Sequence, residues 1–192
     1  LNKNKVIGAY RAAKNNGDLT DREHMEFRTS IALFDKKAEN KIPAFIDFLK
    51  KNRDAIVSSF IFIFPIEFGE KLLPELQKFT PNYKSLFDKD IKNTVLEFKN
   101  KKMECIVTCK RLSQGVDVQN LRTVIMFYCE QDLMTIQRIG RTLRTDPNDP
   151  DKRGLIIDFF QPSRQFDVDF SDTKRFIWLQ ELAKIKKGNL ND

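Results

Sequence analysis

The chain has 192 residues, of which 41% are hydrophobic and 32% are charged, a composition that favours a soluble globular domain. Its longest apolar run, FIFIFPI, contains a proline and is too short to cross a membrane, so we expect no membrane span. The net charge of +7 favours a polyanionic partner such as nucleic acid, although an AT-rich genome would also enrich lysine.

Residues 1–55 are predicted to form a helical lead-in, or linker, that carries no chemistry of its own. Thr20 or Asp21 stands before a helical pattern, and Glu23 follows at the spacing of a helix N-terminal cap. A second helix is predicted in KIPAFIDFLKKN, where apolar residues recur at helical spacing and Pro43 falls in the first turn. We expect this lead-in to pack on the domain that follows.

Residues 56–192 are predicted to form an α/β domain. The apolar stretches VSSFIFIF, MECIVTC, RTVIMFYC and GLIIDFF have the character of buried strands, and helical patterns lie between them. Strands that are apolar throughout and alternate with helices indicate a mainly parallel sheet with helices on both faces and right-handed crossovers. The stretch DTKRFIWLQELAKIKK is predicted to close the chain as a last helix.

The cysteines are predicted to be free thiols rather than metal ligands. Cys105 and Cys109 stand four residues apart in an apolar run, so a strand would place them on the same face. The third cysteine is Cys129, and the only histidine, His24, is far away in the sequence. Buried thiols in a reducing cytoplasm account for this pattern better than a metal site, so we expect no bound metal.

The stretch TIQRIGRTLR concentrates charge on a helix predicted over residues 130–144. At about 100° per residue, Gln137, Arg141 and Arg144 fall within about 60° of one another on one face. Arg138 is predicted to point a quarter turn away from that line. An apolar stripe runs beside the line and is predicted to be buried: Leu133, Ile136, Gly140 and Leu143.

This line of two guanidiniums and an amide suits the oxygens of a phosphate, because a guanidinium offers planar paired donors. An arginine-rich solvated helix face is the alternative, and it accounts for any single arginine. It accounts less well for the whole set, because the neighbouring sequence offers only Glu130 and Asp132 as carboxylate partners. The segment therefore favours phosphate binding.

The segment VTCKRLSQGVD adds polar residues at the end of a strand. The strand is predicted to end near Thr108, and Gly115 allows an unusual backbone or a close approach in the turn that follows. Asp117 then lies beyond the carboxyl end of the strand, where open parallel sheets bind ligands. Its carboxylate would accept a hydrogen bond from a ribose hydroxyl or, in the alternative, from its own turn backbone.

Together these stretches resemble the motifs of superfamily 2 helicases. QRIGRTLR resembles motif VI, whose pattern is Q/H-R-x-G-R-x-x-R, and VTCKRLSQGVDV resembles motif V. SSFIFIFP fits the loosely defined motif IV. The five fixed positions of motif VI arise by chance in a chain of this length with a probability on the order of 10⁻⁴, and motif V stands upstream in the expected order. The resemblance covers about residues 57–160.

The resemblance implies the fold and two catalytic residues. The fold would be a RecA-like three-layer sandwich, in which a central, mainly parallel sheet has helices on both faces and an N-terminal helical lead-in precedes it. Arg141 and Arg144 match the arginine fingers that reach the γ-phosphate of ATP bound on the preceding lobe.

The resemblance also implies ATP-facing and nucleic-acid-facing positions. Gln137 matches the first position of motif VI, which couples ATP to the contacts between lobes. Gly115 and Asp117 match the motif V pair, with the aspartate near the ribose or the interlobe network. Three further residues match positions near the nucleic-acid phosphates: Thr108, Ser113 and Gln114.

Two motifs of a complete motor do not occur in the sequence. No G-x-x-x-x-G-K-[ST] motif is present, and no D-E-x-[DH] box precedes motif IV, so the residues that hold the phosphates and Mg²⁺ are expected on another lobe. The chain begins at Leu1 without a signal peptide, which indicates a piece of a larger cytoplasmic protein. We therefore expect the second lobe of an ATP hydrolase, inactive by itself, with ATP and Mg²⁺ bound mainly by an N-terminal RecA-like lobe.

Two features favour a DNA helicase or translocase. DEAD-box RNA helicases typically carry HRIGRTGR and one residue fewer between the Thr and Gly of motif V, whereas this sequence has Gln137 and the longer spacing. The pattern is closer to the motor subunits of type I and type III restriction enzymes and to repair helicases, so single- or double-stranded DNA is the expected partner. The alternative is a nucleic-acid-binding adaptor without ATPase activity, which the intact Gln137, Arg141, Arg144 and Asp117 disfavour.

Overall fold

The computed structural model divides into two compact units, and each is described by itself. The core unit is Glu39–Phe160, and the second unit joins Leu1–Ala38 to Gln161–Asp192. This division differs from the predicted one between residues 55 and 56, because residues 39–55 belong to the core unit. The structure describes residues 3–36, 38–87, 91–109, 118–128, 132–142, 144–160 and 171–188.

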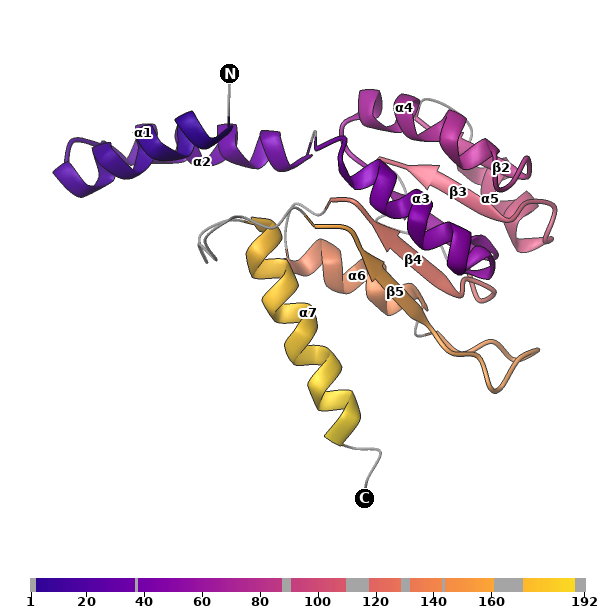
Figure 1. Cartoon of the computed structure of the whole chain (residues 1–192). Helices are drawn as coiled ribbons and strands as arrows, with labels where there is room; N and C mark the ends of the chain where they lie inside the picture. Colours follow the sequence, from indigo (N-terminus) through magenta and orange to yellow (C-terminus); the bar gives the residue numbers. More distant parts are fainter. Residues whose placement is uncertain are drawn as a thin grey trace. The chain divides into compact units, whose positions relative to one another are not determined.

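The core unit alternates helices with short strands, as its sequence pattern predicts. Its elements in chain order are α3 (Lys41–Lys51), the 3-10 turn η1 (Arg53–Ile56), β1 (Ser59–Phe62), α4 (Ile66–Gln77), β2 (Tyr83–Leu86), α5 (Ile91–Lys99), β3 (Cys105–Thr108), β4 (Thr123–Met126), α6 (Asp132–Thr142) and β5 (Leu155–Asp158). In the described part of the chain the strands form one parallel sheet, in the order β2-β3-β1-β4-β5 (Figure 1). The prediction of an α/β domain around a parallel sheet is confirmed.

One face of the sheet is covered by α3 and α4. Side chains alternate between the two faces of a strand, so Ile61 of β1 and Ile125 of β4 point to the same side and join one apolar cluster. α3 supplies Phe45 and Leu49, which lie one helical turn apart and are fully buried. This packing makes α3 part of the core unit. α4 adds three buried side chains to the cluster: Phe68, Leu72 and Leu76.

The opposite face is covered by α5 and α6. Phe60 of β1 packs on Phe98 of α5, with the ring centroids 5.0 Å apart. Two residues along β1, the ring centroid of Phe62 lies 4.2 Å from Cζ of Arg138 in α6. Both phenylalanines alternate with Ile61, so they point away from the α3–α4 face. The core unit therefore has three layers, with helices on both faces of the sheet.

Among the described residues, Cys105 and Cys109 form no disulfide. Cys105 of β3 is buried in the apolar cluster, and Cys109 packs against the same cluster from just beyond the strand. Burial raises the pKa of the Cys105 thiol to about 12, so this sulfur stays protonated and apolar at neutral pH. Cys129 lies outside the described residues.

The second unit begins with a helical hairpin of α1 (Lys3–Asn16) and α2 (Asp21–Lys36). Thr20 and Glu23 cap α2 reciprocally: the Thr20 amide donates to Glu23 Oε2 at 2.9 Å, and the Glu23 amide donates to Thr20 Oγ1 at 3.4 Å. The predicted helix start is thus confirmed, with Thr20 as the cap. The unit also contains α7 (Ser171–Gly188), where Arg175 donates to Asp172 at 2.9 Å and both side chains are buried.

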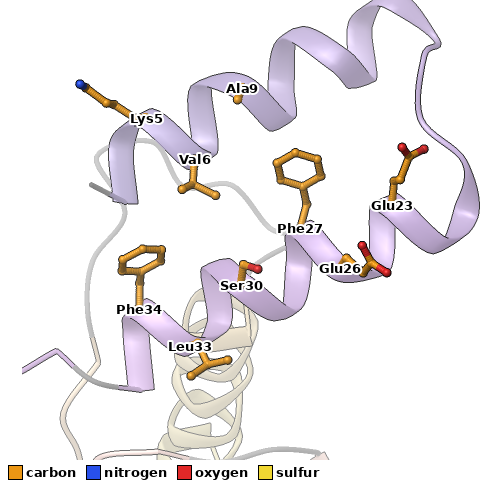
Figure 2. Close-up of a pocket in the computed structure, with 9 residues that line it drawn as sticks. All are labelled: Lys5, Val6, Ala9, Glu23, Glu26, Phe27, Ser30, Leu33 and Phe34. Carbon is orange, nitrogen blue, oxygen red and sulfur yellow. The ribbon is translucent and has the colours of Figure 1, made fainter. Parts of the chain in front are cut away.

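A groove of about 680 Å³ runs along the α1–α2 hairpin. Phe27 and Phe34 project from α2 toward α1 beside Val6, whereas Lys5 and Glu23 lie toward opposite ends of the groove (Figure 2). The groove is lined by none of the residues that the helicase motifs single out. No described helix combines the length and the apolar character that a membrane crossing requires.

Candidate functional site

Thr108 and the start of α6 lie near one edge of the sheet in the core unit. Parallel strands point the same way, and the register pairs Phe62, the last residue of β1, with Thr108 of β3 and with Met126 of β4. The carboxyl ends of these three strands therefore share an edge, which is where open α/β sheets bind ligands. α6 begins at Asp132, soon after β4 ends, so the start of the arginine-rich helix lies near the same edge. Its last residue, Thr142, lies beside Gly154, just before β5, toward the opposite edge.

Thr108 ends β3 and is completely buried. Its carbonyl accepts a hydrogen bond from the Ile63 amide at 2.9 Å, which extends the β1–β3 pairing by one residue. Its Oγ1 has no hydrogen-bond partner among the described residues. Thr108 stands directly before the motif V turn, and its contact with nucleic-acid phosphates stays a prediction.

Several predicted residues lie outside the part of the chain that the structure describes. Ser113, Gln114, Gly115 and Asp117 fall in the undescribed residues 110–117. The same holds for three members of the predicted apolar stripe of α6, whose side chains are not described: Leu133, Ile136 and Leu143. Their predicted roles therefore remain predictions.

Arg138 is a buried anchor of α6, with 1% of its surface exposed. Its Nη1 donates to the carbonyl oxygen of Tyr128 at 2.9 Å, and its guanidinium lies over the ring of Phe62. A backbone carbonyl and an aromatic face are partners that compensate a guanidinium for lost water. Arg138 therefore joins α6 to the ends of β1 and β4.

The buried side of α6 includes arginines. Among the α6 side chains that the structure describes, four are buried: Arg138, Ile139, Arg141 and Thr142. Gly140 is exposed and Gln137 is half-buried. The prediction that Gly140 lies on the buried stripe is wrong. The prediction that Arg141 belongs to an outward-facing line of side chains is also wrong, because Arg141 is 6% exposed. The reason is that Arg138 points inward to Tyr128 and Phe62. Arg141 and Thr142 lie about one helical turn later, so they face the same buried side.

Arg144 lies just beyond the end of α6 and is exposed. The predicted helix runs to this residue, whereas α6 ends at Thr142. Lys152 fixes the backbone here, because its Nζ donates to the carbonyl of Arg144 at 2.7 Å and to that of Gln119 at 2.6 Å. Partial burial lowers the pKa of Lys152. Arg144 is thus an exposed side chain on a backbone that is held in place.

Lys41 is a residue of this edge that the motifs did not single out. It is the first residue of α3, is 3% exposed, and donates from Nζ to the carbonyl oxygen of Phe127 at 2.9 Å. A sequence signal was present: Lys41 stands at i, i+4 and i+8 with Phe45 and Leu49, so a lysine occupies the apolar stripe of an amphipathic helix.

The arrangement can bind an anion beside the last turn of α6. Arg144 is exposed there, next to the chain that enters β5, and guanidiniums pair well with phosphate oxygens. Arg141 lies within the lobe, one helical turn beyond Gln137. The described residues contain no group of three His, Cys, Asp or Glu side chains that would hold a metal ion.

Comparison with known families gives one match, over residues 40–146, to the model described as "Helicase conserved C-terminal domain". The match covers more than half of the chain and begins at the start of the core unit. Among curated proteins, none matches the chain.

Solved structures with the same fold include S. cerevisiae Dbp5 bound to RNA and ADP BeF3, at 18% identity and a TM-score of 0.54, over 78% of this chain and 42% of that one. An HsdR subunit fragment of a type I restriction enzyme from Vibrio vulnificus YJ016 is 17% identical, with a TM-score of 0.55, over 76% of this chain and 29% of that one. The DNA-bound helicase MrfA is 16% identical, with a TM-score of 0.51, over 64% and 17%. The likeness confirms the predicted RecA-like fold, and the chain spans less than half of each of these proteins.

Proposed function

Because this chain belongs to the helicase conserved C-terminal domain family, whose members are parts of ATP-dependent helicases, we propose that it is the second motor lobe of an ATP-dependent DNA helicase or translocase. The observation that carries the proposal is the placement of α6. Arg138 anchors α6 to the ends of β1 and β4, and Arg144 follows the last turn of the helix, exposed and on a backbone that Lys152 holds in place.

In this proposal Arg141 and Arg144 serve ATP that is bound on a first lobe outside this chain. Charge builds up on the phosphate oxygens during phosphoryl transfer, and an arginine delivered from a neighbouring element stabilises that charge. Such fingers contribute about 10³ to 10⁵ in rate in related systems. Arg144 is exposed for this role, whereas Arg141 is 6% exposed and would act at the boundary between the lobes.

ATP and Mg²⁺ would be held mainly by the first lobe. The sequence contains no Walker A lysine motif, which is the element that holds the β- and γ-phosphates in such motors. Gln137, Gly115 and Asp117 would complete the nucleotide site from this side. Closing and opening of the cleft between the lobes would then change the grip on the nucleic acid.

Thr108, Ser113 and Gln114 are proposed to lie along the nucleic-acid track. Contacts to the phosphate backbone give affinity without sequence preference, which suits a motor that steps along any sequence. The choice of DNA rests on Gln137 and on the motif V spacing. ATP turnover of the full-length protein on DNA and on RNA of the same length tests it, and stronger stimulation by RNA would contradict it.

The finger assignment is tested by Arg141→Ala and Arg144→Ala in the full-length protein. Each variant should lower the turnover number for ATP by about 10³, while ATP affinity changes much less. Arg153→Ala is the matched control, because Arg153 is exposed and outside the motifs, and it should turn over ATP normally. Normal turnover in both finger variants would contradict the assignment.

The alternative is an adaptor that binds nucleic acid without hydrolysing ATP. A wild-type full-length protein that binds DNA but shows no DNA-stimulated turnover would favour it.

A further inference from the structure

Lys41 is a buried lysine that none of the helicase motifs includes. Only 3% of its surface is exposed, and its Nζ donates to the Phe127 carbonyl oxygen at 2.9 Å across 86 residues of sequence. Burying an ammonium group is costly unless it is paired and hydrogen-bonded. An apolar residue would fill this position on α3 at lower cost, so the lysine calls for a role that its charge or its hydrogen bond supplies.

The acceptor of Lys41 is the first residue after β4, on the chain that leads into α6. The next carbonyl, that of Tyr128, accepts from Arg138 of α6 at 2.9 Å. Two consecutive carbonyls are therefore held by cationic side chains, one from α3 and one from α6. Phe127 and Tyr128, the two residues that follow β4, are thus held from both faces of the sheet.

Aromatic contacts hold the same residue from the α3–α4 face. The Phe127 ring lies 5.3 Å from that of Phe45 in an edge-to-face arrangement and 5.1 Å from that of Phe159, nearly parallel to it. Phe45 stands one helical turn after Lys41 on α3. α3 therefore contacts both the ring and the carbonyl of Phe127, so a displacement of α3 would shift the end of β4.

We propose that Lys41 is a positioning residue for the arginines of α6. It acts through the Phe127 carbonyl on the residues that follow β4, and through the neighbouring Tyr128 carbonyl and Arg138 on the placement of Arg141 and Arg144. Lys41 is also the first residue of α3, so its hydrogen bond to Phe127 connects the start of this helix to the residues beside Arg138. The inference rests on the proposed function, since it assigns Lys41 an effect on ATP hydrolysis.

Three substitutions in the full-length protein test this role. Lys41→Met removes the donor and the charge, Lys41→Arg keeps both, and Lys50→Met removes an exposed charge from the same helix. We expect Lys41→Met to lower kcat for ATP by about 10- to 100-fold, with KM changed by less than about twofold. Lys41→Arg should recover part of kcat, and Lys50→Met should match the wild type.

A double variant separates positioning from general destabilisation. If Lys41 acts through the fingers, Lys41→Met should lower kcat little further in a protein that already carries Arg144→Ala. Losses that multiply would overturn the proposal, as would an unchanged kcat in Lys41→Met, or a raised KM with normal kcat. Thermal unfolding of each variant shows that it is folded, and Lys41→Gln replaces Lys41→Met if the latter does not fold.

The proposed function fails on a different result. Normal turnover by Arg141→Ala and Arg144→Ala removes the finger role whatever Lys41 does. Full loss in those variants with normal kcat in Lys41→Met removes only the positioning role.

Discussion

At the residue scale, Arg138 shows how an arginine of a ligand-binding motif can serve the fold. Its Nη1 satisfies the Tyr128 carbonyl, and its guanidinium covers the Phe62 ring. The side chain is 1% exposed, so its partners lie inside the lobe. Arg144, six residues later, is exposed. These two of the motif's three arginines therefore differ in role: Arg138 anchors the helix and Arg144 faces outward.

The anchoring role predicts that Arg138→Met destabilises the isolated chain. The substitution keeps much of the side-chain volume but leaves the buried Tyr128 carbonyl without its donor. A lost hydrogen bond of this kind costs about 1–3 kcal/mol of unfolding free energy. Urea unfolding followed by circular dichroism measures it.

The control for Arg138 is Arg153→Met, which removes an exposed arginine and should change stability by less than about 0.5 kcal/mol. Equal midpoints for the two variants would show that the Tyr128 contact adds nothing to stability.

Side-chain orientation in α6 was the least predictable part of the site. The residue types predict a helix with arginines turned outward, because guanidiniums are seldom buried. The burial of Arg138 depends on the Tyr128 carbonyl and the Phe62 ring, which lie on other elements. The hydrophobic periodicity of the helix sequence carries no information about such partners. Lys41 is similar: its place in an apolar stripe was readable, but its acceptor was not.

At the element scale, the strands were predictable and the ends of the helices were less so. The apolar runs that become β1, β3 and β4 are short and uninterrupted, as strands buried on both faces require. GLIIDFF was predicted to be a buried strand as well, but β5 lies at the edge of the sheet and is partly exposed. α3 was assigned to the lead-in by its place in the sequence, but Phe45 and Leu49 lie in the sheet cluster. α6 was predicted to reach Arg144, yet it ends at Thr142.

The end of α6 is in close contact with the chain before β5. A Cβ placed on Gly154 would lie 2.8 Å from the carbonyl oxygen of Thr142, a backbone atom. Gly154→Ala should therefore displace the last turn of α6 and lower stability by about 1–3 kcal/mol, the usual cost of overpacking. Thermal unfolding of the isolated chain measures it.

Gly140→Ala is the matched control within α6. Gly140 is exposed, and an added Cβ meets no atom within 4 Å. Alanine is favoured over glycine inside a helix by about 1 kcal/mol, so this variant should be more stable than the wild type. If Gly154→Ala were as stable as Gly140→Ala, the backbone at Thr142 would relax to admit the added Cβ at no cost in stability.

At the scale of the whole molecule, the motifs predicted the lobe and its parallel sheet. Motif order and strand alternation carry that information, because both are local in sequence. The division at Glu39 could not be predicted in the same way, since it depends on which apolar faces meet. Motif V lies largely in residues 110–117, so the nucleotide and nucleic-acid roles of that turn rest on the sequence.

The central claim is that ATP is hydrolysed between this lobe and another lobe, and one measurement tests it most directly. ATP turnover is measured for the 192-residue chain alone and for the full-length protein, each with and without DNA. We predict no appreciable turnover by the chain alone and DNA-stimulated turnover by the full-length protein. Robust turnover by the pure 192-residue chain would contradict the claim.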